Sequence, residues 1–127
     1  MNMPRMPRIL SVIAALVLLA TAAFHATGHS ALADELGRSQ LTPFFQQSLP
    51  GIWLFFSCHL VTVAFGLGWV ALRGSGSARP LLIFLAAVVC LDTLFVLSLA
   101  GLFAGTLLLS GAALFTIIAA IRWPAGV

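Results

Sequence analysis

Long apolar stretches, separated by short polar segments, run along the whole chain. Residues 9–27 are apolar apart from a few hydroxyl residues and His25. Residues 51–72 form a second run, whose only strongly polar member is His59. Because a helix rises about 1.5 Å per residue and the hydrocarbon core of a bilayer is about 30 Å thick, each run predicts one membrane-spanning helix.

The third apolar run, residues 81–121, is too long for a single crossing. It carries one charge, Asp92, and as a single helix it would extend about 61 Å, about twice the core thickness. We expect the chain to reverse near Gly101 and Gly105, because glycine relaxes the backbone in the middle of the run. These glycines also form a GxxxG pattern, but its place at a helix end favours a turn over a dimer face.

The pattern as a whole predicts an all-α integral membrane protein. Its fold is expected to be an antiparallel four-helix transmembrane bundle, with spans at about 9–27, 51–72, 81–100 and 104–121. The chain, 1–127, is then a single transmembrane domain with an outer loop over 30–50 and a cytoplasmic loop over 73–80.

The outer loop is the only sizeable segment outside the predicted spans. Apolar residues recur among its polar ones, namely Leu32, Leu36, Leu41, Phe44, Phe45 and Leu49. This pattern predicts a short interfacial helix, of one or two turns, with its apolar side toward the lipid. Thr42 and Pro43 suit the first positions of a helix. Pro50 with Gly51 is expected to break or kink the chain before the second span.

Composition points to lipid as the main solvent of this chain. Of its 127 residues, 61% are hydrophobic and 7% are charged, whereas soluble domains have about 45–50% apolar and about 25% charged residues. A chain this short cannot hide such a surplus in a core. The formal net charge of +3 comes from six arginines scattered singly or in pairs between apolar runs. They form no basic face, which argues against nucleic acid as a partner.

The arginines also predict the orientation in the membrane. Five of the six fall on one side of the predicted bundle: Arg5, Arg8, Arg73, Arg79 and Arg122. By the positive-inside rule this side is cytoplasmic, which makes the chain a multi-pass protein of a bacterial-type inner (plasma) membrane with both termini in the cytoplasm. Trp53 near the outer side, and Trp69 and Trp123 near the inner side, fit the aromatic belts of the two interfaces.

The N-terminal segment has a second interpretation. Two arginines, an apolar stretch and the small residues Ala31 and Ala33 before Asp34 are also typical of a secretory signal peptide. Cleavage after Ala33 would leave three spans. We expect the first span to be retained, because its apolar run is long for a signal peptide and already ends at Phe24, well before the cut.

Polar residues inside the predicted spans are few, and such residues are costly in lipid. His59 and Asp92 lie at matching distances from the outer ends of their spans, each about 12 Å deep. The other polar residues near this level are His25, His29 and Ser110. Four antiparallel helices would bring these side chains toward the outer half of the bilayer.

Several chemistries fit this group. His59 and Asp92 can form an interhelical hydrogen bond that only fixes helix packing. His25, His29, His59 and Asp92 together offer the nitrogen and oxygen ligands of a transition-metal site for zinc, copper or iron. His25 and His59 could instead hold a haem between two helices, although Arg38 is the only outer cation for its propionates. A proton or ion relay through Asp92 is the remaining alternative.

No motif of a known catalytic site stands out. The sequence has no glycine-rich phosphate loop and no Ser-His-Asp set with a nucleophile elbow. We interpret Cys58 and Cys90 as small buried hydrophobic residues rather than a redox pair. The leading hypothesis is a small accessory or structural membrane protein that packs against itself or a larger membrane complex. The rival is a metal- or haem-binding membrane protein with a redox role.

One further pattern resembles a known family. The first span is followed by H-x-x-x-H over 25–29, a short amphipathic loop, and a second span containing F-S-C-H-L over 56–60. This order, over about residues 1–75, is similar to that of the YgdD-like family of small four-span membrane proteins, whose function is unknown. The family's usual Gly-Ala-His is here A-F-H over 23–25, and its third span, rich in glycine and serine, here carries Asp92. The resemblance implies the four-span count and a recurring structural place for His59, and it implies no activity.

The arginine distribution yields the first testable prediction, that both ends of the chain and the loop over 73–79 lie on the cytoplasmic side. Fusions of a reporter that is active only in the cytoplasm, placed after Val127 and within this loop, should both be active. A fusion within 38–42 should be inactive. An inactive reporter at either cytoplasmic position contradicts the topology.

Overall fold

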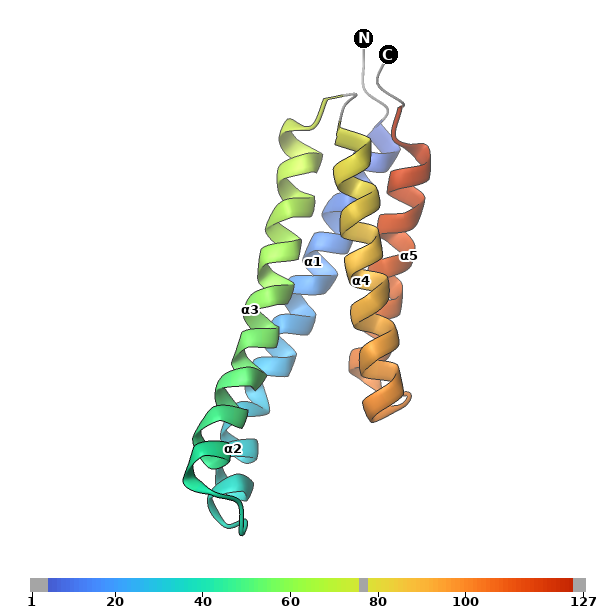
Figure 1. The fold of residues 1–127 in the computed structure, drawn as a ribbon. Coiled ribbons are helices and arrows are strands. Elements are labelled where there is room, and N and C mark those ends of the chain that lie inside the picture. Colours follow the sequence, from blue (N-terminus) through green and yellow to red (C-terminus); the bar gives the residue numbers. More distant parts are fainter. Residues whose placement is uncertain (1–4, 76–77, 125–127) are drawn as a thin grey trace.

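The chain folds into helices in a computed structural model that describes residues 5–75 and 78–124. The helices are α1 (Arg5–Thr27), α2 (His29–Gly37), α3 (Pro43–Arg73), α4 (Arg79–Ala100) and α5 (Ala104–Arg122). The four long helices α1, α3, α4 and α5 run antiparallel to their neighbours in the chain (Figure 1). Each is long and apolar enough to cross a membrane, with α2 continuing α1. The expected fold class is confirmed.

Local backbone chemistry accounts for the turn between α4 and α5. Gly101 has φ of +70°, the only positive φ among the described residues, and glycine alone adopts this conformation without strain. Two residues later the start of α5 is capped: Thr106 Oγ1 accepts from the Phe103 N–H at 2.9 Å and donates to the Phe103 carbonyl at 2.8 Å. The predicted reversal near the two glycines is confirmed.

The segment between the first two spans is more helical than the sequence indicated. Over 30–50, where one short interfacial helix was expected, the chain forms most of α2 and the first turns of α3, joined by residues 38–42. Thr42 is extended and Pro43 begins α3 as expected. However, α3 continues through Pro50, so of the two effects expected there, a break or a kink, the break does not occur.

A proline inside a helix costs about 3 kcal/mol, because it removes a hydrogen bond to the carbonyl four residues earlier. Packing offsets this cost here, since Pro50 is buried and α2 lies against α3. The side chain of Gln46 further ties α3 to the connection by donating to the Ser39 carbonyl at 3.1 Å. Tertiary contacts therefore decide where this helix begins.

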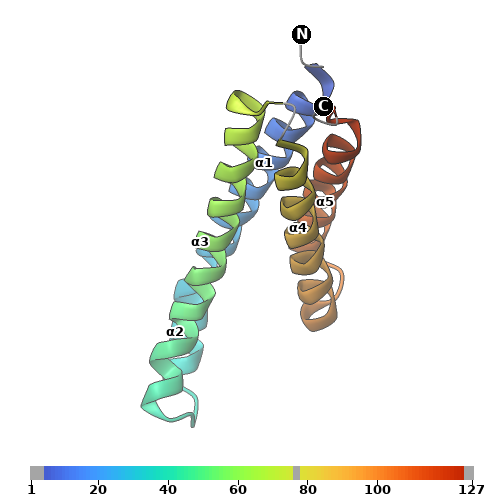
Figure 2. The same ribbon diagram turned by 45° about the horizontal axis from the view of Figure 1, so that its top comes forward.

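The helices differ in length, and this shapes the molecule. Helix α3 has 31 residues and α4 has 22, a difference of about 14 Å at 1.5 Å per residue. As a result, α2 and the start of α3 project beyond the turn between α4 and α5 (Figures 1 and 2). The projecting part carries Asp34, Glu35 and Arg38. We call it the α2 end, and the opposite end, with Arg5, Arg8, Arg73, Arg79 and Arg122, the arginine end.

At the arginine end, Trp123 packs against the connection between α3 and α4 and hydrogen-bonds to it. Its side chain is 2% exposed, and its Nε1–H donates to the Ser75 carbonyl at 2.9 Å. A Cβ at Gly74 would lie 2.9 Å from the Trp123 ring, so this close approach requires glycine. Trp123 is therefore packed inward rather than exposed as the belt interpretation implied, whereas Trp69 is 67% exposed.

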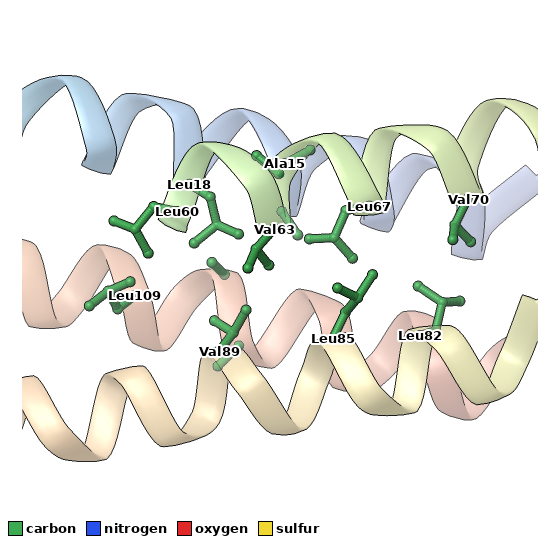
Figure 3. Packing of buried hydrophobic residues seen from close by; sticks show 14 of the residues in the cluster. Ala15, Leu18, Leu60, Val63, Leu67, Val70, Leu82, Leu85, Val89 and Leu109 are labelled. Atoms are coloured by element: carbon green, nitrogen blue, oxygen red, sulfur yellow. The ribbon is translucent and has the colours of Figure 1, made fainter. Parts of the chain in front are cut away.

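Helix α1 lies between α3 and α5. It contacts α3 and α5 more extensively than any other two helices contact each other. Leucine and valine side chains from all four long helices meet in one core (Figure 3). The labelled members are Ala15, Leu18, Leu60, Val63, Leu67, Val70, Leu82, Leu85, Val89 and Leu109.

Small residues line the contact faces of α1 and α5. Those buried on α1 include Ser11, Ala14, Ala15, Thr21 and Ala22, and those on α5 include Gly105, Ala112, Ala113, Thr116, Ala119 and Ala120. Small side chains let two helix backbones approach closely, which is how helices associate where lipid removes the usual hydrophobic driving force. The buried hydroxyls are satisfied within their own helices; Thr116, for example, donates to the Ala112 carbonyl at 2.7 Å.

This packing predicts the effect of enlarging one interface residue. Ala112 is 0% exposed, so Ala112→Leu should force α5 off its neighbours and lower the free energy of unfolding by about 1–3 kcal/mol. The same change at the exposed Ala87 of α4 is the matched control and should be nearly neutral. Reversible unfolding in mixed micelles measures both, and equal effects of the two substitutions would contradict the prediction.

Candidate functional site

The predicted pair of His59 and Asp92 is present and joins α3 to α4. His59 Nε2 and Asp92 Oδ2 are 2.9 Å apart and hydrogen-bonded. An ionised carboxylate can only accept, so in that state His59 donates from Nε2. His59 precedes Arg73 by nearly the same number of positions as Asp92 follows Arg79, which puts both about 20 Å from the arginine end. Equal depth on antiparallel helices brings them together.

The pair belongs to a regular seam between α3 and α4. Two helical turns closer to the arginine end, a side chain at Gly66 would meet the methyl groups of Leu85 at 3.4 Å. The steps from His59 to Gly66 and from Leu85 to Asp92 both match one heptad, the repeat of an antiparallel coiled-coil seam. Beyond the pair, toward the α2 end, α3 diverges from α4 (Figures 1 and 2). The described hydrogen bond between these two helices is the one that joins His59 to Asp92.

The pair is not fully covered by the chain. The side chain of His59 is 33% exposed and that of Asp92 is 17% exposed. On the same part of α3, Cys58 and Thr62 are exposed as well. Cys58 therefore does not fit the interpretation as a buried hydrophobic residue, whereas Cys90 is half-buried.

His25 takes part in a separate contact, between α1 and α3. Its ring stacks on Trp53 with centroids 4.1 Å apart and planes at 14°. His25 Nδ1 and the Ser57 hydroxyl are hydrogen-bonded at 3.0 Å, and Trp53 Nε1–H donates to the His25 carbonyl at 2.7 Å. A Cβ at Gly28 would lie 2.9 Å from the indole, so glycine leaves room for Trp53 against α1.

Phe56 contacts both imidazoles. Its ring meets His25 edge-on at a centroid distance of 5.1 Å, and it lies 6.2 Å from the ring of His59. Trp53, His25, Phe56 and His59 thus form a row of rings that ends at Asp92. Phe56 occupies the space between the two histidines that a shared metal or haem site would join.

The other candidate ligands lie apart from this row. His29 is the first residue of α2 and is half-exposed. Within residues 5–75 and 78–124, no group of three or more His, Cys, Asp or Glu side chains is arranged to hold a metal ion. The structure brings together His59 with Asp92, and His25 with Ser57, rather than the four candidates.

Ser110 also lies outside this row. It is exposed, and its hydroxyl donates to the Thr106 carbonyl of its own helix at 2.7 Å. Ser110 was expected to join the polar side chains of the outer half. Among the described residues, no contact between Ser110 and those side chains supports this expectation.

Sequence reasoning missed Trp53, Phe56 and Ser57 as members of the site. One sequence feature was available: Trp53 precedes Arg73 by as many positions as His25 follows Arg5. On antiparallel helices this equal spacing places both about 30 Å from the arginine end. Only the rotation of α1 relative to α3, which the tertiary packing sets, brings the rings face to face.

Comparisons with known proteins identify no relative of this chain. No family model matches the chain, and neither a curated protein nor a solved structure matches it. The resemblance to the YgdD-like family thus depends only on the residues given above. What the helices define is a class: a small multi-pass helical membrane protein with four candidate spans and a His–Asp pair between two of them.

The energetic role of the pair is measurable by a double-mutant cycle. We expect His59→Ala and Asp92→Ala to couple by about 0.6 kcal/mol, the average for interhelical hydrogen bonds in membrane proteins, because each change removes the same bond. Unfolding in mixed micelles provides the four free energies of unfolding.

The control cycle combines His59→Ala with Ser110→Ala, whose hydroxyl bonds only its own helix, and should show no coupling. Asp92→Asn keeps an acceptor for the imidazole and should cost less stability than Asp92→Ala. Equal coupling in both cycles, or none in either, would contradict a direct bond.

Proposed function

We propose that this chain is a small accessory protein of a membrane assembly, and that it acts by packing α3 and α4 against a further transmembrane helix at His59 and Asp92. The single observation that carries the proposal is the partial exposure of this hydrogen-bonded pair. The further helix belongs either to a second copy of the chain or to a larger membrane complex.

The energetic argument concerns the lipid that would otherwise touch the pair. An aspartate at the centre of a membrane helix costs about 2.5–3.5 kcal/mol on insertion scales, and such residues nearly always face a protein interior or water. Here the chain covers Asp92 only in part and leaves a third of His59 exposed. A partner helix seated over the pair would remove both side chains from lipid.

The surroundings of the pair suit helix docking. Among the candidate spans, α4 has the smallest share of its residues buried inside the chain. Beside the pair, α3 presents Cys58 and Thr62, which are small and exposed. Small residues allow a second helix to approach closely, and polar side chains can bond across the contact.

The proposal places the arginine end in the cytoplasm of a bacterial-type inner membrane, following the positive-inside rule. It also retains the first span. Helix α1 supports this, because it supplies Ala14, Leu18 and Ala22 to the core. Cleavage after Ala33 would remove the helix that contacts both α3 and α5.

Metal or haem binding is the rival hypothesis, and it has a direct test. Elemental analysis and an absorption spectrum of the full chain purified in detergent would detect a bound transition metal or haem. A stoichiometric metal lost on Asp92→Asn, with the helices still assembled, would favour the rival over a packing role.

The docking proposal predicts site-specific cross-linking in native membranes. A photoreactive amino acid at Cys58 lies beside the pair and should form a discrete protein adduct, whose mass distinguishes a second copy from another protein. Leu107 is the matched control, because it is 64% exposed on α5 and is separated from Arg122 by the same spacing as Cys58 from Arg73. It should yield lipid adducts only.

A second variant tests whether cross-linking at Cys58 depends on the pair of His59 and Asp92. Replacing both His59 and Asp92 by leucine removes the polar contact while keeping apolar bulk, and should lower the yield at Cys58 severalfold. Adducts of equal yield at Cys58 and Leu107, or a yield unaffected by the double replacement, would overturn the proposed docking face.

A further inference from the structure

We infer that the groove between α4 and α5 at the arginine end binds one anionic phospholipid, with Arg79 holding the phosphate and an acyl chain lying along the groove. This surface is distinct from the face at His59 and Asp92. The inference therefore goes beyond the proposed function, and it does not depend on which side of the membrane the arginine end faces.

The groove has the shape and lining of an acyl-chain site. It is an open groove of about 220 Å³, lined by Arg79, Ile83, Ala86, Ile117, Ala120 and Ile121. Ala86 and Ala120 are 7% and 5% exposed and form its floor, whereas Ile83 and Ile121 are 53% and 66% exposed and form its walls. Small residues below and branched residues at the sides make an apolar channel open toward lipid.

Arg79 places a guanidinium at the mouth of this groove. Its Nε atom is buried and has no hydrogen-bond partner among the described residues. A buried donor without an acceptor is costly, and a guanidinium presents its N–H groups in a fork that matches a phosphate. Arg79 is also the first residue of α4, so the free N–H groups of that helix's first turn add positive potential at the same place.

Charge complementarity identifies the occupant. Five arginines gather at the arginine end, while the three acidic residues of the chain, Asp34, Glu35 and Asp92, all lie elsewhere. No carboxylate side chain there can neutralise Arg79. Basic pockets between transmembrane helices bind anionic lipid head groups. An anionic phospholipid satisfies both halves of the site, whereas a free anion leaves the isoleucine-lined groove unfilled.

Native mass spectrometry of the full chain in detergent micelles tests this inference. Phosphatidylglycerol added at increasing concentration should bind at one saturable site, and phosphatidylcholine of the same acyl composition should bind more weakly. Arg79→Gln should weaken phosphatidylglycerol binding about tenfold, equivalent to about 1.4 kcal/mol. Arg73→Gln is the matched control, because Arg73 is at the same end but does not line the groove, and it should change binding little.

Each other outcome would overturn the inference. Equal losses in Arg79→Gln and Arg73→Gln would indicate diffuse attraction to the whole arginine end, and equal binding of the two lipids would exclude head-group recognition. Inorganic phosphate that competes with the lipid at matching affinity would indicate an anion site without an acyl-chain groove.

A second measurement uses the unmodified chain and so does not depend on the folding of a variant. Phosphatidylglycerol with a photoreactive acyl chain should label peptides containing Ile83, Ile117 or Ile121. Labelling spread evenly over all exposed helix faces, including Leu107 of α5, would contradict an acyl chain that lies in the groove.

Discussion

Close contact of α1 with both α3 and α5 is the constraint on which the rest of this structure depends. In lipid, apolar surface alone does not drive helices together, so association rests on fit between backbones and on polar contacts. Helix α1 provides the fit through small residues such as Ala14 and Ala15, which are nearly or fully buried. Because α1 contacts both α3 and α5, it links α3 to the α4–α5 hairpin, and α3 itself meets α4 only along a limited seam.

Polar side chains reinforce the bundle where this apolar fit is thin. His59 and Asp92 join α3 to α4, two long helices that otherwise contact each other little and diverge toward the α2 end (Figure 1). Trp53 and Ser57 hold His25 between α1 and α3. Phe56 links the two contacts, because its ring lies against both His25 and His59. The polar group is thus a structural element that remains open to a neighbour on one side.

Much of the fold follows from the sequence because hydrophobic length is a strong constraint in a membrane. Three apolar runs, two of them about as long as the hydrocarbon core is thick and the third about twice as long, predict four helices, and Gly101 marks the reversal within the third run. Equal depth likewise predicts that His59 meets Asp92. The start of α3 was not predictable in this way, because Pro50 disrupts a helix in isolation, and it is packing against α2 that outweighs the cost.

The sequence by itself thus determined the number of long apolar helices, their antiparallel order and the distance of each polar residue from the end of its helix, since rise per residue converts sequence position into depth. The tertiary structure decided which way each side chain faces. Phe56 lies between His25 and His59 and contacts both rings. The Ser110 hydroxyl bonds its own helix, and Trp123 is packed inward. The physical reason is that depth depends on spacing along one helix, whereas rotation about the helix axis depends on the packing of all its neighbours.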